Sequence, residues 1–236
     1  MTAKKALLLA RMDPPDKNEA DWNNWYNGTH VANRENIPGF LSSRRFEKVE
    51  GLPVAYHTPG QAQYLGLYDV TGIRVLTGAA YGKVREKEFA TPPDSYENTI
   101  FKLPKFARLI YREIDCGIDG YTPPGTKYVF IVGHDVPRNK HAEFNAWYNT
   151  EHIPDLLSIP GFVSVRRFAL DEKVIPPITD RGGVSSQYLT IWDLESEDAL
   201  TCSEFTNKSA SPWTQWIRGW YTRQVCTLYK QIFPVI

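Results

Sequence analysis

The residues best suited to acid/base chemistry occur twice in the chain, in the pattern Tyr-Asn-x-x-His, at residues 26–30 and again at residues 148–152. A histidine, with an ordinary pKa near ~6.5, can take or give a proton at neutral pH. A tyrosine hydroxyl and an asparagine amide one turn away can hold a carbonyl or phenolate oxygen. Such a set suits enolisation, dehydration or retro-aldol cleavage. The candidate catalytic residues are His152, His30, Tyr148 and Tyr26, and the candidate substrate ligands beside them are Asn149 and Asn27.

The same side chains also have a structural interpretation. In a helix, Trp22, Tyr26 and His30 fall at i, i+4 and i+8 and form one stripe that could simply pack on a sheet. The retention of tyrosine, asparagine and histidine in two otherwise divergent copies favours a pocket function for at least one copy. Glu151 and Asp155 flank the second histidine and could orient or charge its imidazole. The sequence favours His152 slightly, and the choice between the copies stays open.

The two copies belong to a longer internal repeat, which indicates how the chain is organised. Residues 23–46 and 145–168 align without a gap and agree at 13 of 24 positions. A repeat of this length predicts two related halves, each large enough to bury a core. We expect a first repeat at residues 1–114, a linker at 115–126 and a second repeat at 127–236.

Hydrophobic periodicity predicts the order strand, helix, strand, strand, helix, strand in each half. This is the ferredoxin-like βαββαβ unit, an antiparallel sheet with both helices on one face. The bare faces of two such sheets can cover each other, so the fold class is α+β, with two tandem ferredoxin-like repeats whose sheets form one α+β barrel. The expected elements are residues 5–12, 17–36, 39–49, 63–70, 72–90 and 106–114 in the first half, and 127–136, a helix through residues 147 and 152, 161–170, 187–194, 195–208 and 226–233 in the second.

The motif WYNxxHxPxLLxxPGFxxxRRF, followed by a strand that begins QYL, closely resembles the dimeric α+β barrel superfamily and, within it, the EthD-like proteins. The resemblance covers both halves and implies the barrel fold. That superfamily includes isomerases, polyketide cyclases, dehydratases, cofactor-free oxygenases and haem proteins. In its cofactor-free enzymes a histidine, sometimes with a tyrosine, is the acid/base, which implies that role for His30 or His152. His152 is followed by Ile153 and Pro154 and keeps the family's HxP, whereas the first copy does not.

Alternation along the next strand places Phe40, Ser42, Arg44 and Phe46 on one side, with equivalents in the second half. An arginine among phenylalanines needs a partner. One interpretation is a structural ion pair with Asp69 or Asp193 of the neighbouring strand; the other is a clamp for a substrate carboxylate or phenolate. On the second interpretation the candidate ligands are Arg44 and Arg166.

The stretch "SPWTQWIRGWY" concentrates aromatic residues between the second helix and the last strand of the second half. It could line a pocket for an aromatic or polycyclic substrate, or form a hydrophobic plug or an oligomer contact. The long loop at 171–186 could act as a lid. The candidate substrate-binding residues from this stretch are Trp213, Trp216 and Trp220.

Composition excludes several other classes of function. The 27 basic and 27 acidic residues balance, so neither a nucleic-acid footprint nor a polybasic membrane patch is indicated. The three cysteines form no CxxC pair, and no set of residues has zinc or iron spacing, so we expect no metal. The absence of a secretion signal or an apolar span predicts a cytoplasmic protein.

The sequence therefore predicts a cofactor-independent enzyme that uses histidine acid/base chemistry on a small hydrophobic, aromatic or carbonyl-bearing compound, as a lyase, isomerase or cyclase. A cofactor-free oxygenase or a haem-binding protein is the second hypothesis, and a non-catalytic binding protein is the third. A homodimer is compatible with each of them.

Overall fold

A closed barrel of eight antiparallel strands forms the centre of the molecule, as seen in a computed structural model that describes residues 5–115, 125–171 and 185–236. The strands follow the order β1-β3-β2-β8-β5-β7-β6-β4. Each half contributes a four-stranded sheet, and the halves join where β2 pairs with β8 and β4 pairs with β6. The predicted fold class, two ferredoxin-like repeats forming one α+β barrel, is confirmed.

The elements of the two halves correspond closely, with a helical layer after the first strand and another after the third. The first half contains β1 (Ala6–Met12), α1 (Glu19–Trp25), η1 (Tyr26–Val31), α2 (Ala32–Glu35), β2 (Phe40–Lys48), η2 (Val54–Tyr56), β3 (Tyr64–Val70), α3 (Ile73–Thr77), α4 (Ala79–Phe89), α5 (Tyr96–Thr99), η3 (Ile100–Lys102) and β4 (Ala107–Ile114). The second half contains β5 (Tyr128–Asp135), η4 (Arg138–Lys140), α6 (His141–Trp147), η5 (Tyr148–His152), α7 (Ile153–Leu157), β6 (Phe162–Leu170), β7 (Tyr188–Leu194), η6 (Glu197–Leu200), α8 (Ser203–Lys208), α9 (Pro212–Arg218) and β8 (Arg223–Phe233).

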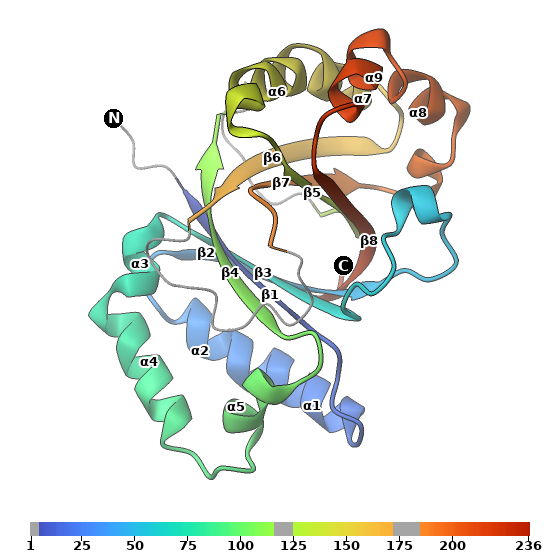
Figure 1. Ribbon diagram of the computed structural model, residues 1–236. Helices are drawn as coiled ribbons and strands as arrows, with labels where there is room; N and C mark the ends of the chain where they lie inside the picture. The colour runs from blue at the N-terminus through green and yellow to red at the C-terminus, as the bar shows by residue number, and fades with distance from the viewer. Residues whose placement is uncertain (1–4, 116–124, 172–184) are drawn as a thin grey trace.

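The helices cover the outside of the barrel on two opposite sides. In Figure 1 the helices of the first half lie below the strands and those of the second half lie above them. Strand alternation divides the core accordingly: Leu7 and Leu9 point into the barrel, while Leu8 and Ala10 face the helices. The outer face of each sheet, under its helices, is where the repeated histidines lie. Within the described ranges, no helix has the length and apolar character needed to cross a lipid bilayer.

The turn after the first helical layer is built in the same way in both halves. Gly39 and Gly161 have φ angles of 100° and 94°, which glycine adopts without strain. The carbonyl of each glycine accepts a backbone hydrogen bond from the residue after the third strand of its half, at 2.8 Å from Thr71 and 2.9 Å from Glu195. The Pro-Gly pair therefore ends the helix and fixes the start of the next strand.

Three details of the predicted strands and helices were wrong. A β-bulge between Phe40 and Ser42 reverses the alternation there, so Phe40 packs in the helix-facing core while Phe46 lies inside the barrel. The predicted helix over 72–90 is divided at Gly78, and the aromatic stretch of the second half contains an additional helix, α9. This helix begins with a Ser-Pro pair in which the Ser211 hydroxyl accepts from the Thr214 amide at 3.0 Å.

Candidate functional site

A π-helical segment sets the geometry around each repeated histidine. In η5 the chain takes an extra residue in its turn, so that residues five apart face each other. Trp147 and His152 are five apart, and their rings stack with centroids 4.4 Å apart. Tyr148 meets the same imidazole edge-on at 5.0 Å. In the first half, η1 places Trp25 5.1 Å from His30, with the two rings tilted at 51° to each other.

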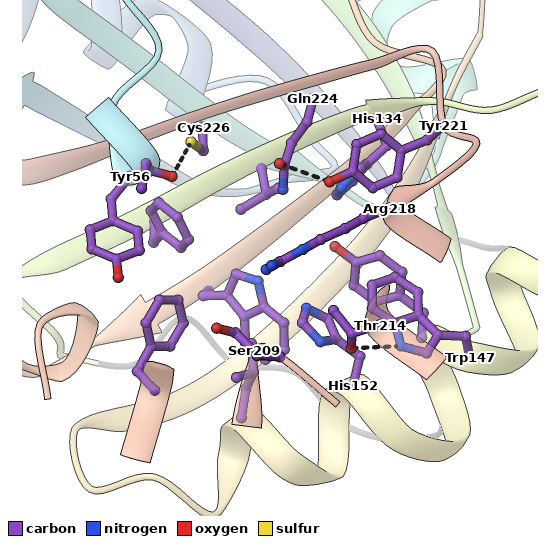
Figure 2. A pocket seen from close by; sticks show the side chains of 18 of the residues that line it. Tyr56, His134, Trp147, His152, Ser209, Thr214, Arg218, Tyr221, Gln224 and Cys226 are labelled. Carbon is purple, nitrogen blue, oxygen red and sulfur yellow. Dashed lines mark hydrogen bonds between the residues drawn. The ribbon is translucent and has the colours of Figure 1, made fainter. Parts of the chain in front are cut away.

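A pocket of about 440 Å³ opens beside His152, between the outer face of the second sheet and helices α6 to α9. Its volume lies within the range of small-molecule sites, ~300–1,000 Å³. Figure 2 shows its side chains converging from the strands above and the helices below. The lining residues are Ala55, Tyr56, Phe130, Val132, His134, Trp147, Tyr148, His152, Leu156, Trp192, Phe205, Thr206, Ser209, Ala210, Thr214, Arg218, Tyr221, Gln224 and Cys226.

A second histidine, His134 at the end of β5, lies in the same pocket. It is 2 % exposed, and its ring lies 5.9 Å from that of Tyr148 and 5.0 Å from that of Tyr221. The pocket thus holds two imidazoles, those of His134 and His152, and both lie next to the ring of Tyr148. A comparison of the two repeats could have pointed to His134, because the first half has Met12 at the equivalent position and the two copies therefore differ there.

Burial keeps these groups uncharged at neutral pH. It lowers the pKa of His152 to about 3, and the charges of Arg218 and Arg167 add to that effect, as does His134. The pKa of His134 is also lowered to about 3, by burial and then by Arg167 and Arg218. Burial raises the pKa of Tyr148 to about 12, against the opposing effect of the Arg167 charge. Both imidazoles are therefore neutral, and the Tyr148 phenol keeps its proton.

The first half contributes one wall of this pocket through the loop between β2 and β3. Tyr56 packs edge-on against Phe205 at a centroid distance of 5.3 Å. Thr58 and Cys226 join the loop to β8 by two hydrogen bonds, one from the Thr58 amide to the Cys226 carbonyl at 2.8 Å and one from the Cys226 amide to the Thr58 hydroxyl at 3.0 Å. The site is therefore built from both halves. The corresponding loop of the second half, predicted to be a lid, lies mostly outside the described residues.

The space around His30 is filled instead. A cavity of about 30 Å³ remains, and a buried ion pair between Arg34 and Glu88 occupies the rest together with Arg108 and Tyr81, which hydrogen-bond at 2.8 Å. The equivalents of Arg34 and Arg108 in the second half are the shorter Leu156 and Cys226.

His30 is buried, and other side chains surround it closely. Burial lowers its pKa well below the usual value, and Arg34 and Arg45 reinforce the shift. Its Nδ1 atom lies 3.5 Å from Glu88, whose carboxylate already accepts two hydrogen bonds from Arg34. The structure thus gives His152, and not His30, a cavity that could hold a ligand.

The repeated asparagines hold an arginine and do not line the pocket. Arg167, 1 % exposed, donates to Asn149 and Asn145 at 2.8 Å each, and its guanidinium lies 4.1 Å from the centre of the Tyr148 ring. The first half repeats this arrangement with Arg45 bonded to Asn27 and Asn23. The retention of Asn149 and Asn27 therefore has a structural cause, the anchoring of the helix to its strand.

The candidate ligands Arg44 and Arg166 lie inside the barrel, away from the pocket. Arg44 donates to Asp193 at 3.0 Å, and Arg166 pairs with Asp69. The acidic residues are those expected for a structural ion pair, but each belongs to the opposite half rather than to a neighbouring strand. A substrate in the pocket does not reach either guanidinium.

The three candidate tryptophans lie around the pocket without lining it. Trp213 and Trp220 pack against the core of the second half, and Trp216 is 58 % exposed, with its indole N–H donating to Glu143 at 2.7 Å. The same stretch supplies three side chains that do line the pocket, namely Thr214, Arg218 and Tyr221. The concentration of aromatic residues correctly indicated that this stretch lines the pocket. Helix α9, however, turns residues other than the tryptophans toward the cavity.

No family model and no curated protein sequence matches the chain. Solved structures share its fold. A proposed monooxygenase from Fusobacterium nucleatum subsp. nucleatum is 7 % identical, with a TM-score of 0.60 over 98 % of this chain and 94 % of that one. An anthrone oxidase-like protein is 11 % identical, with a TM-score of 0.58 over 97 % and 91 %. A mutant chlorite dismutase from Candidatus Nitrospira defluvii, in complex with cyanide, is 9 % identical, with a TM-score of 0.51 over 98 % and 92 %. At these identities the likeness shows an α+β barrel of a kind found in enzymes; the resemblance to EthD-like proteins stays a prediction.

Proposed function

We propose that this protein is an enzyme that binds a flat, hydrophobic compound in the second-half pocket and removes a proton next to a carbonyl or phenol group, with His152 as the base. The supporting observation is a neutral imidazole that borders a cavity of about 440 Å³, while the equivalent imidazole of the first half borders about 30 Å³. In this proposal Tyr148 donates a hydrogen bond to the oxygen on which charge develops, and Trp147 fixes the imidazole plane by stacking.

The proton transfer leaves an enolate or phenolate in the pocket, and its fate defines the reaction. Return of the proton to another carbon gives an isomerase, and loss of a leaving group gives a lyase. Reaction with dioxygen gives a cofactor-free oxygenase, our second candidate, which the monooxygenase and anthrone oxidase-like names of the fold neighbours favour. All three begin with the same deprotonation.

Haem, the cofactor of the remaining alternative, fits the residues poorly. Two neutral imidazoles are present, as an axial ligand requires. However, one face of His152 is covered by Trp147, and Arg218 extends through the middle of the pocket in Figure 2, where a flat macrocycle would need an apolar slot. We expect no Soret shift when haemin is titrated into the protein.

Hydrogen exchange tests the deprotonation directly. Anthrone and 2-naphthylpyruvate, which carry acidic C–H groups, would be incubated with the protein in D₂O without oxygen, and deuterium incorporation followed by NMR. We expect catalysed exchange of at least one compound and a loss of about 10²- to 10⁴-fold in rate in His152→Asn. His30→Asn is the matched control and should keep the wild-type rate. Equal rates in wild type and His152→Asn would refute the proposed base.

Oxygen uptake then separates the two candidates. With air admitted, consumption of dioxygen together with the exchanging compound would support the oxygenase. Exchange without oxygen consumption would support an isomerase or lyase.

A further inference from the structure

The charge inside the second-half pocket is unbalanced. None of its lining residues is Asp or Glu, and Arg218 is the one permanent charge among them. The two histidines are neutral at pH 7 for the reasons given above. A pocket with a cation and no anion favours a ligand that carries negative charge.

Arg218 is an exposed residue and differs from the buried arginines that a carboxylate neutralises. Arg34, Arg44 and Arg166 each have a carboxylate within 4 Å. Among the described residues, none of the carboxylates lies within that distance of Arg218, which ends helix α9. Figure 2 shows its guanidinium in the middle of the pocket, between Gln224 and Tyr221 on one side and His152 on the other.

Polar groups lie beside the guanidinium (Figure 2). The Tyr221 hydroxyl donates to Gln224 Oε1 at 3.0 Å. The remaining surroundings are aromatic, with Trp192 and Phe130 on the sheet and Phe205 on helix α8. Aromatic walls around one planar, multidentate cation fit an aromatic ring that bears an anionic oxygen group.

We propose that Arg218 determines substrate specificity by binding the anionic oxygen group of an aromatic carboxylate or an acidic phenol. The inference rests on the proposed function in that it concerns the same pocket, and it names the substrate class. An anion bound at Arg218 would also offset the guanidinium charge, which is one of the smaller causes that lower the pKa of His152.

Calorimetric titration with matched pairs of ligands tests the proposal without any turnover. The first pair is 2-naphthoate and its neutral isostere 2-naphthamide; the second is 2,4-dinitro-1-naphtholate and its methyl ether. We expect at least one anion to bind about 10-fold or more tightly than its neutral partner. The pair that shows the preference tells whether the group is a carboxylate or a phenolate.

Variants assign the preference to one side chain. Arg218→Gln should bind anion and neutral partner equally, Arg218→Lys should keep part of the preference, and Arg74→Gln, at an exposed arginine outside the pocket, should behave as wild type. Retention of the full preference in Arg218→Gln, or the lack of any preference in wild type, would overturn the proposal. His152→Asn should keep the preference, so failure of the proposed base and failure of this inference give different results.

Discussion

Single substitutions between the two copies explain why one histidine borders a cavity and the other does not. Leu156 and Cys226 in the second half stand where Arg34 and Arg108 fill the first. His134 replaces Met12 and adds a second imidazole. The asparagines that both copies share build the scaffold, and the residues that differ open the cavity beside the shared tyrosine and histidine.

The buried imidazole of His134 should make stability depend on pH. Its pKa is about 3 in the folded protein and ~6.5 when unfolded, so between these values the unfolded chain binds the additional proton. This contribution to stability is complete above pH 6.5 and is lost as the pH falls toward 3. In urea unfolding between pH 6.5 and 5, His134→Asn should reduce the pH slope by up to ~1.4 kcal/mol per pH unit. An unchanged slope would show that His134 takes up a proton in the folded state.

Helix and strand are joined by the arginine that the two asparagines hold. The guanidinium fork of Arg167 donates to Asn145 and Asn149 at once and lies on the Tyr148 ring, so it fixes the π-helical segment that positions His152. A lysine ammonium is a point charge and cannot bridge both amides. Hydrophobic patterning thus sets the order of helices and strands along the chain. The guanidinium of Arg167 sets how the helix is oriented on its strand.

The conservative change Arg167→Lys should therefore be costly. We expect a loss of about 1–3 kcal/mol in the free energy of unfolding, measured with urea, because buried amide oxygens lose their donors. The equivalent change Arg45→Lys should cost a similar amount. The two should differ in ligand affinity, which should fall in Arg167→Lys alone, since only the second half holds the larger pocket. Weaker binding in both variants would mean that the Arg45 contacts of the first half also affect the ligand site.

The sequence predicted the helices and strands better than it predicted the site. The physical reason is that helices and strands follow from residues close together in the sequence, whereas the site depends on residues far apart in it. The order of elements in each half follows from hydrophobic periodicity, and the single α+β barrel follows from the repeat; the barrel was confirmed. The π-helical turn adds one residue per turn without a sequence signature of its own, so the stacking of Trp147 on His152 could not be foreseen. Arg218 and Tyr56 reach the pocket through tertiary packing from a short helix and from the opposite half.

At the scale of the whole molecule, two reciprocal ion pairs inside the barrel hold the halves together. Arg44 pairs with Asp193 and Arg166 with Asp69, and serines on the same strands, Ser42 and Ser164, donate to the same carboxylates at 2.7 and 2.8 Å. The four charged side chains are nearly inaccessible to water. Each half thus provides the charge that the other half requires.

Removing one member of such a pair should cost more than removing both. Arg166→Met leaves the Asp69 carboxylate buried without its cation, and we expect a loss of about 3–5 kcal/mol in the free energy of unfolding. Adding Asp69→Leu should recover most of that loss, because two apolar groups then replace two charges. Urea unfolding of the three proteins measures both effects. A double variant as unstable as the single one would show that the ion pair itself is strongly stabilising.

The two junctions that close the barrel, β2 with β8 and β4 with β6, use equivalent strands of the two halves. A first half can therefore receive a second half from its own chain or from another one with the same contacts. The link between the halves gives the internal partner a high effective concentration, which favours the closed monomer. At high protein concentration, exchange of halves would produce dimers whose barrels and ligand sites are the same as in the monomer, with Tyr56 of one chain forming the wall of a pocket that belongs to the other.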